Sequence, residues 1–229
     1  RIARTPQVPN RGPRSSWNNS SPFRVLPLGR PEALMHCPVP QFPRLEVAGH
    51  TPLWRFLVDN TISSIRSEFE RYHAVAEGAL TQMGHDAFFH APDSDANSVA
   101  ILVKHMAGNL TSRWTNFLTT DGEKPHRDRD SEFELTPEDT RETLMMHWSA
   151  SWQLVFHELG RLNDVDLSRA VYLRGQSLSV SAALLKQLTH TVCHVGQIVT
   201  LAHQQTKSWQ SLSVPRGQSA ALNERMRNG

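Results

Sequence analysis

Two histidines four residues apart, His190 and His194, lie within an apolar stretch from Leu188 to Val199 that contains no turn signal. On a helix, residues at this spacing stand one above the other on the same face, so both imidazoles can reach one ion. Divalent metals such as zinc bind the neutral ring nitrogen of histidine. The pair therefore indicates a metal site, which needs at least one further ligand.

An earlier helical stretch supplies that ligand. Beside its apolar stripe runs a line of residues at spacings of three and four: Leu102, His105, Asn109 and Arg113. Three neutral imidazoles from two facing helices leave coordination positions open for water, the layout of a catalytic metal site. We therefore predict that the metal ligands are His105, His190 and His194. We predict three residues that bind a small substrate beside the metal: Asn109, Arg113 and Gln197.

Other interpretations of these residues stay open at this point. The chain has twelve histidines, so chance pairs at a spacing of four are expected, and His190 and His194 also fit the edge of a core. Cys193 reaches the same ion from one helix, but a small buried thiol is the commoner role of such a residue. The remaining histidines weighed as ligands are His73, His85, His147 and His157, whereas His126 fits a surface position.

Four long stretches repeat apolar residues at intervals of three and four, which is typical of amphipathic helices. They run from Thr51 to Met83, from Asn97 to before Asp121, from Thr136 to Gly160, and from about Ser181 to Gln204. Proline after a capping residue marks the start of the first and the third. The pattern predicts an all-α protein built as a four-helix bundle.

The connections carry weaker signals. We expect a loop from His85 to Asp95 and a solvated surface loop from Asp121 to Glu134, where charges alternate densely. The stretches on either side of Arg174-Gly175-Gln176 predict a short hairpin, as an appendage on the helices. The tail is irregular, yet Trp209 is too apolar to leave in water, so we expect it to fold back on the bundle.

Composition divides the chain into an extension, residues 1–50, and a domain, residues 51–229. The extension is rich in proline and arginine, carries a net charge of +5 and is predicted to be disordered. The domain has 17 basic and 20 acidic side chains, so no basic stripe for nucleic acid is expected. The apolar runs are too short for a membrane helix, and the two cysteines suggest no disulfide framework. We expect a soluble, cytoplasmic protein.

Several segments resemble the DinB-like (YfiT-like) metalloenzyme superfamily, and more narrowly an uncharacterised bacterial branch of it. They are Asn97–Leu110, Arg113–Pro125, His190–Gln197 and Trp209–Ser219. The resemblance covers approximately Pro52 to Asn223 and implies a four-helix bundle and frequent homodimers. It also implies a divalent metal, often nickel or zinc, on one histidine of the second helix and a pair on the fourth. By position these are His105, His190 and His194.

The resemblance and the residues together predict a metal-dependent enzyme acting on a small molecule, a transferase or a hydrolase. Some relatives transfer low-molecular-weight thiols to electrophiles, so the nucleophile is expected to be a metal-activated thiolate or water. The alternative is a non-catalytic bundle that binds metal or dimerises in a stress-linked role. Binding to DNA is a third idea, and the acidic domain argues against it.

Overall fold

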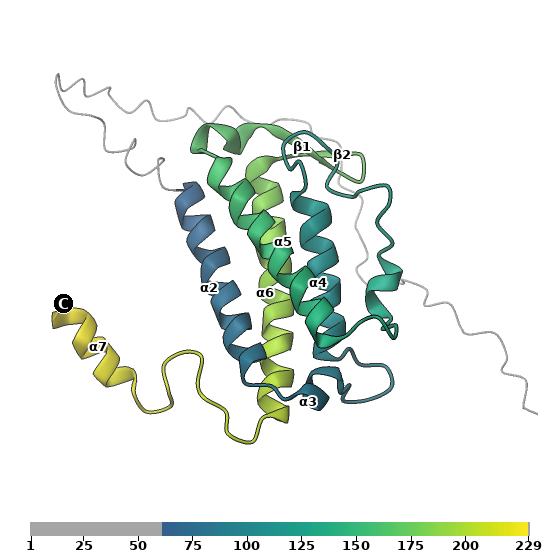
Figure 1. Cartoon of the computed structure of the whole chain (residues 1–229). Helices are drawn as coiled ribbons and strands as arrows, with labels where there is room; N and C mark the ends of the chain where they lie inside the picture. Colours follow the sequence, from purple (N-terminus) through teal and green to yellow (C-terminus); the bar gives the residue numbers. More distant parts are fainter. Residues whose placement is uncertain (1–60, 229) are drawn as a thin grey trace, which may run out of the picture. The chain divides into compact units, whose positions relative to one another are not determined.

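The computed structural model describes residues 61–228, which are mainly helical and carry one small sheet (Figure 1). The helices are α2 (Thr61–Thr81), α3 (His85–Phe89), α4 (Val99–Trp114), α5 (Arg141–Arg161), α6 (Val180–Gln205) and α7 (Ser219–Asn228). Two short 3-10 helices are η1 (Asp130–Phe133) and η2 (Asp164–Ser168), and the strands are β1 (Ala170–Leu173) and β2 (Gln176–Ser179). The prediction of an all-α protein is confirmed at this level.

Three long helices begin at a hydroxyl side chain that accepts a hydrogen bond from a backbone N–H of the first turn. Ser98 caps α4, Thr140 caps α5 and Ser179 caps α6. Such caps satisfy donors that the helix itself leaves without a partner. The predicted start of α5 at Thr136 is wrong, because the Asp139 carboxylate accepts the Thr136 N–H and closes a separate turn before the helix.

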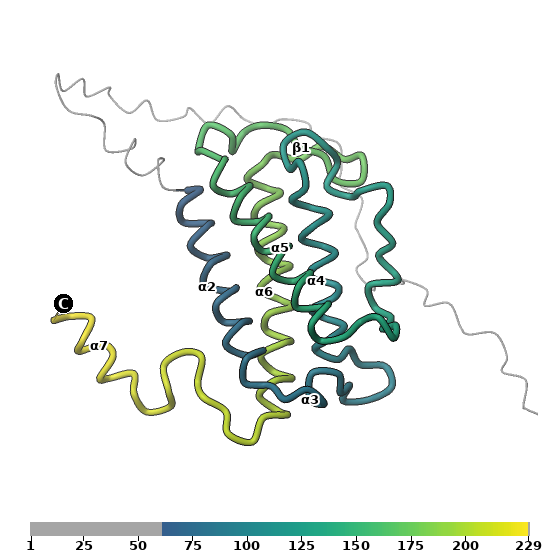
Figure 2. The backbone as a smooth tube through the Cα atoms, in the orientation of Figure 1, coloured from purple at the N-terminus to yellow at the C-terminus, as the bar shows by residue number. Residues whose placement is uncertain are grey.

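The four long helices pack around aromatic side chains. α4 lies against α5, α2 lies against α6, and α4 also contacts α6 (Figures 1 and 2). Phe69 of α2 meets Trp114 of α4 edge-on at 5.5 Å between ring centroids, and Trp148 and Trp152 of α5 are equally buried. Edge-to-face aromatic pairs add specific geometry to apolar burial. This core fixes how closely α4 approaches α6, and therefore how the predicted ligands meet.

The connection after α2 differs from the prediction. Part of the expected loop from His85 to Asp95 is the short helix α3, whose Phe88 is buried in the core. A five-residue helix holds little more than one turn, so it shows no measurable apolar period in the sequence.

The hairpin that the sequence predicted is confirmed, with β1 and β2 antiparallel and Val171 opposite Leu178. Its turn at Arg174 and Gly175 has positive φ at both residues, as the right-handed twist of two-residue hairpins favours. It is not an appendage. Val171 is 4% exposed, and the Tyr172 carbonyl accepts the Gly122 N–H at 2.8 Å.

The segment after α6 returns along α2. Trp209 stacks on His203 with ring centroids 5.1 Å apart, and the next residue, Gln210, donates its backbone N–H to Gln82 Oε1, just after the end of α2. α7, which the sequence did not predict, has no buried residue. The predicted extension and the predicted helix start at Thr51 lie outside the described residues.

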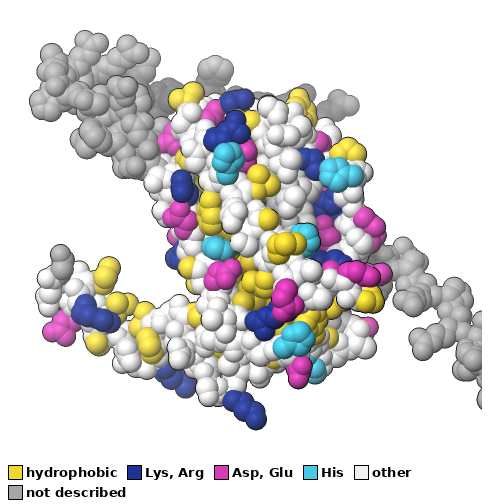
Figure 3. Space-filling model, viewed as in Figure 1, with side chains coloured by type: hydrophobic (Ala, Val, Ile, Leu, Met, Phe, Trp, Pro, Cys, Tyr) yellow, Lys and Arg dark blue, Asp and Glu magenta, His cyan; other side chains and the backbone are white. Residues whose placement is uncertain are grey.

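The described surface gives two further observations. Acidic and basic side chains are interspersed on the face drawn in Figure 3. Among residues 61–228, no helix combines the length and the apolar character needed to cross a bilayer.

Candidate metal centre

α4 and α6 bring the three predicted ligands together. His105 projects from α4, and His190 and His194 stand one turn apart on α6. One ring nitrogen from each residue lies within 4.8 Å of the other two. The Nε2 atom of His190 is 3.4 Å from that of His105 and 3.2 Å from that of His194. Elsewhere in residues 61–228, no other set of histidine, cysteine and carboxylate side chains is grouped in this way.

These spacings suit a divalent ion with four ligands. With Zn–N bonds of about 2.0–2.1 Å, two nitrogens of a tetrahedral site lie about 3.3–3.4 Å apart. The two Nε2 separations, 3.4 and 3.2 Å, fall close to this value. Three histidines would fill three positions of such an ion and leave the fourth for water or substrate.

Hydrogen bonds at the far side of two rings determine where their lone pairs point. His105 donates through Nδ1 to the Glu132 carboxylate at 2.9 Å, and His194 donates through Nδ1 to Gln197 Oε1 at 2.7 Å. A neutral imidazole protonated at Nδ1 carries its lone pair on Nε2. Both lone pairs therefore face His190 Nε2, which has at most one proton to offer. A cation between the three nitrogens removes this mismatch.

Glu132 is itself held in place. It is 6% exposed, and Arg127 forms a bidentate pair with its carboxylate, Nε to Oε1 at 2.7 Å and Nη2 to Oε2 at 2.8 Å. Burial alone raises the pKa of Glu132, yet the hydrogen bonds from His105 and Arg127 hold that pKa below its ordinary value. The carboxylate stays ionised and accepts the imidazole proton, an arrangement common behind metal-bound histidines.

A glycine of α4 makes room for this carboxylate. A Cβ atom added at Gly108 would stand 2.8 Å from Glu132 Cδ and closer still to Oε1, nearer than van der Waals contact permits. Glycine inside a helix costs about 1 kcal/mol relative to alanine. Gly108 therefore has a specific role in letting η1 approach α4.

The environment keeps the α6 histidines neutral. Burial, together with the neighbouring His194 and His105, lowers the pKa of His190 to about 4. Burial also lowers the pKa of His194, against the hydrogen bond to Gln197, which raises it. Neutral imidazole is the form that binds a metal, so both rings are ready to coordinate at neutral pH.

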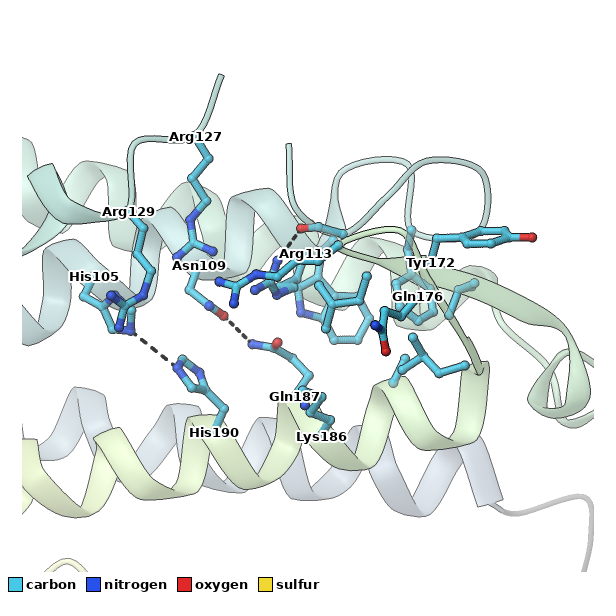
Figure 4. Close-up of a pocket in the computed structure, with 18 of the residues that line it drawn as sticks. His105, Asn109, Arg113, Arg127, Arg129, Tyr172, Gln176, Lys186, Gln187 and His190 are labelled. Atoms are coloured by element: carbon cyan, nitrogen blue, oxygen red, sulfur yellow. Dashed lines mark hydrogen bonds between the residues drawn. The ribbon is translucent and has the colours of Figure 1, made fainter. Parts of the chain in front are cut away.

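The histidines line a cavity of about 850 Å³ between α4, α6, the hairpin and the segment before η1 (Figure 4). Asn109 and Arg113 lie on its wall, one and two turns further along α4 from His105. Asn109 is 5% exposed, and its Oδ1 accepts a hydrogen bond from Gln187 Nε2 at 2.8 Å. A cavity of this size beside a cluster of convergent ring nitrogens can hold a small molecule.

Two residues lie elsewhere than expected. Gln197 is exposed and stands behind His194, where it orients the ring instead of lining the cavity. Cys193 is exposed and so does not take the buried position expected of a small thiol. The other histidines weighed as ligands lie apart from the cluster. His73 packs on Trp152, and His147 and His157 are exposed on α5.

The loop that supports the site was not predicted from the sequence. We interpreted Asp121–Glu134 as a solvated surface loop, and this is wrong for Arg127 and Glu132, which are largely buried. Arg127 pairs with both Glu132 and Glu123, so this charged stretch folds inward without an isolated buried ion. An Arg and a Glu five residues apart give no signal in a sequence that alternates charges throughout.

A protein-family model matches most of the chain. The family described as "Protein of unknown function (DUF1572)" matches residues 57–218, and the chain belongs to this family. No curated protein matches the sequence. The match includes every residue of the candidate site.

Proposed function

We propose that this DUF1572 protein is a DinB-like four-helix bundle in which His105, His190 and His194 hold a divalent metal, nickel or zinc. The metal centre belongs to an enzyme acting on a small molecule in the adjoining cavity, by thiol transfer or hydrolysis. The observation that carries this proposal is the convergence of three Nε2 atoms, two of them with lone pairs directed by their Nδ1 partners, on the cavity wall.

The donor set fits the chemistry. All-imidazole ligands suit zinc and nickel and do not reduce the charge of the ion, as carboxylates would. When bound, such an ion supplies Lewis acidity that lowers the pKa of a coordinated water or thiol and makes it nucleophilic near neutral pH. Glu132 keeps the His105 ring in its required tautomer, and Gln197 does the same for His194.

Side chains beyond the histidines bind and orient the substrate. The Asn109–Gln187 pair leaves the Asn109 amide NH2 and the Gln187 Oε1 without a hydrogen-bond partner in the described part of the chain. Both residues line the cavity, so these groups are available to a carbonyl or a hydroxyl of the substrate. The Arg113 guanidinium, held by the Gly122 carbonyl and Glu123, adds positive charge on the same wall.

Metal analysis of protein purified without a histidine tag tests the proposal. We expect roughly one equivalent of nickel or zinc per chain, lost in His190→Ala because two imidazoles bind an ion far more weakly than three. His157→Ala removes an exposed histidine of α5 and serves as the matched control. Metal content below about a tenth of an equivalent in the native protein, unchanged by His190→Ala, would contradict the proposal.

A non-catalytic role is the competing function, and one observation favours it. The buried Arg127–Glu132–His105 chain ties η1 to α4, so a metal on His105 would also stabilise the fold. Chelation that lowers the melting temperature, while no thiol or electrophile shifts it, would support this alternative.

The homodimer that the resemblance implies is part of either proposal, and sedimentation of the full chain measures it.

A further inference from the structure

The wall of the cavity is strongly basic. None of the lining side chains contributed by residues 61–228 is acidic, whereas five are basic: Arg113, Arg127, Arg129, Arg174 and Lys186. Low-dielectric walls lined by one sign of charge concentrate the field inside a cavity. The positive charge of the wall therefore favours an anionic ligand in the cavity.

Three of these cations are committed to carboxylates behind the wall. Glu123 accepts from Arg113 at 3.0 Å, from Arg127 at 3.2 Å and from Arg174 at 3.0 Å. Arg127 is further occupied by Glu132. These hydrogen bonds hold the three guanidinium groups in place, and the carboxylates of Glu123 and Glu132 offset part of their positive charge.

The other two cations have no such partner. The ammonium of Lys186 makes no hydrogen bond or ion pair with any other residue in the described range. The guanidinium of Arg129 lies over the Phe133 ring, and its carboxylate neighbour, Asp130, is 3.8 Å away with a side chain 97% exposed. Arg129 comes from the segment before η1 and lies beside His105, whereas Lys186 lies on α6 next to Gln187, one turn before His190 (Figure 4).

The end of the cavity under the hairpin is apolar. Trp114 and Phe117 stack with centroids 5.1 Å apart, and Val171, Leu173 and Leu178 of the hairpin complete this end. From His105 to Arg113 is eight residues, about 12 Å along a helix. The two cations of this end, Arg113 and Arg174, are both paired with Glu123. The cations without a close carboxylate therefore lie toward the histidines, and the apolar surface lies about 12 Å along α4 from them.

We propose that the cavity binds an elongated organic anion, a carboxylate or a phosphonate-like group on an apolar body. The anionic head lies between Arg129 and Lys186 beside the histidines, and the body lies against Trp114, Phe117 and the hairpin. This assignment deepens the proposed function by naming its substrate class. It rests on the cavity and its charges, and the head group binds whether or not a metal is present.

Calorimetric titration of the full chain tests this, as purified and again after treatment with a chelator. The probes share one body: phenylbutyrate, phenylbutylphosphonate, phenylbutanol and phenylbutylamine. We expect at least one of the two anions to bind the chelator-treated protein about tenfold or more tighter than the alcohol and the amine do. The alcohol and the amine cannot form the charge-assisted hydrogen bond that the anion accepts. The tighter of the two anions identifies the head group.

Variants locate the head group. Arg129→Met and Lys186→Met should each weaken anion binding by roughly tenfold and leave the alcohol unaffected, because methionine keeps the apolar stem and removes the charge. Lys207→Met, at an exposed lysine outside the cavity lining, is the matched control and should change nothing.

The outcomes separate this proposal from the metal proposal. Equal affinity for the alcohol, no binding of either anion at millimolar concentration, or anion binding that needs the metal and ignores both methionine variants would each overturn it. The last result would leave the metal proposal standing. Selective anion binding by a protein that never retains metal would support this inference and contradict the metal proposal.

Discussion

Replacing Gly108 by alanine adds one methyl group at the point where η1 meets α4. The new Cβ would stand 2.8 Å from Glu132 Cδ, against a carboxylate that already holds His105 and Arg127. Glu132 is 6% exposed, and a shift of its carboxylate away from the new methyl group would lengthen its hydrogen bonds to His105 or Arg127. The substitution therefore perturbs the candidate ligand His105 through its support and leaves all three histidine residues in the chain.

The expected magnitude is a balance of two effects. Alanine gains about 1 kcal/mol over glycine in a helix interior. Overpacking costs about 1–3 kcal/mol, and displacing one member of a buried ion pair costs about 3–5 kcal/mol. We expect Gly108→Ala to destabilise the metal-free protein by roughly 2 kcal/mol or more, and to lower metal affinity about 10- to 100-fold as the support of His105 is lost.

Gly196→Ala is the matched control. Gly196 also lies inside a helix, α6, but an added Cβ meets nothing within 4 Å, so this variant should gain up to about 1 kcal/mol. Urea unfolding of the chelated proteins measures stability, and competition with a chromophoric chelator measures zinc affinity. If Gly108→Ala equals Gly196→Ala in both measurements, Glu132 is not packed against Gly108 and the reasoning fails.

Two further predictions concern the charges of the site. Glu132→Gln places an amide between two donors, the His105 and Arg127 side chains, so zinc affinity should fall about 10- to 100-fold. The control Glu158→Gln, at a buried glutamate of α5, should lower stability and leave zinc affinity unchanged. Equal zinc affinities in the two variants would exclude Glu132 as a support of His105. The pKa of His190 is lowered to about 4, so between pH 6.5 and about 4 the unfolded chain binds a proton that the folded chain refuses. Stability of the chelated protein should therefore fall as the pH drops through this window, and urea midpoints should show a shallower slope for His190→Gln but not for His157→Gln. Equal slopes in all three proteins would show that His190 is not buried as described.

Much of the fold could be predicted because its signals are local. The apolar periods of α2, α4, α5 and α6 repeat over many turns, and the capping serines of α4 and α6 lie beside them. Short elements lack this redundancy. α3 has five residues, and the start of α5 depends on whether Asp139 closes a turn, a choice between competing hydrogen bonds that composition does not resolve.

The candidate ligands were predictable for the same reason. His190 and His194 share a helix face at any spacing of four, and His105 has the same offset from the core stripe of its own helix. The contact made by Gln197 could not be predicted, because a residue three positions after His194 can either contact a substrate or accept the hydrogen bond from His194 Nδ1 that the structure shows.

The sequence by itself determined which residues can ligate a metal, since residue type and helical period are local properties. Only the tertiary structure decided how those residues are supported and what lies beside them. Arg127 and Glu132 lie about twenty to thirty positions from His105 along the chain, and they reach it because Gly108 leaves space and because each charge finds its partner on burial. The hairpin closes the cavity through long-range contacts of the same kind. Pairing between distant side chains has no period, and so it has no signature in the sequence.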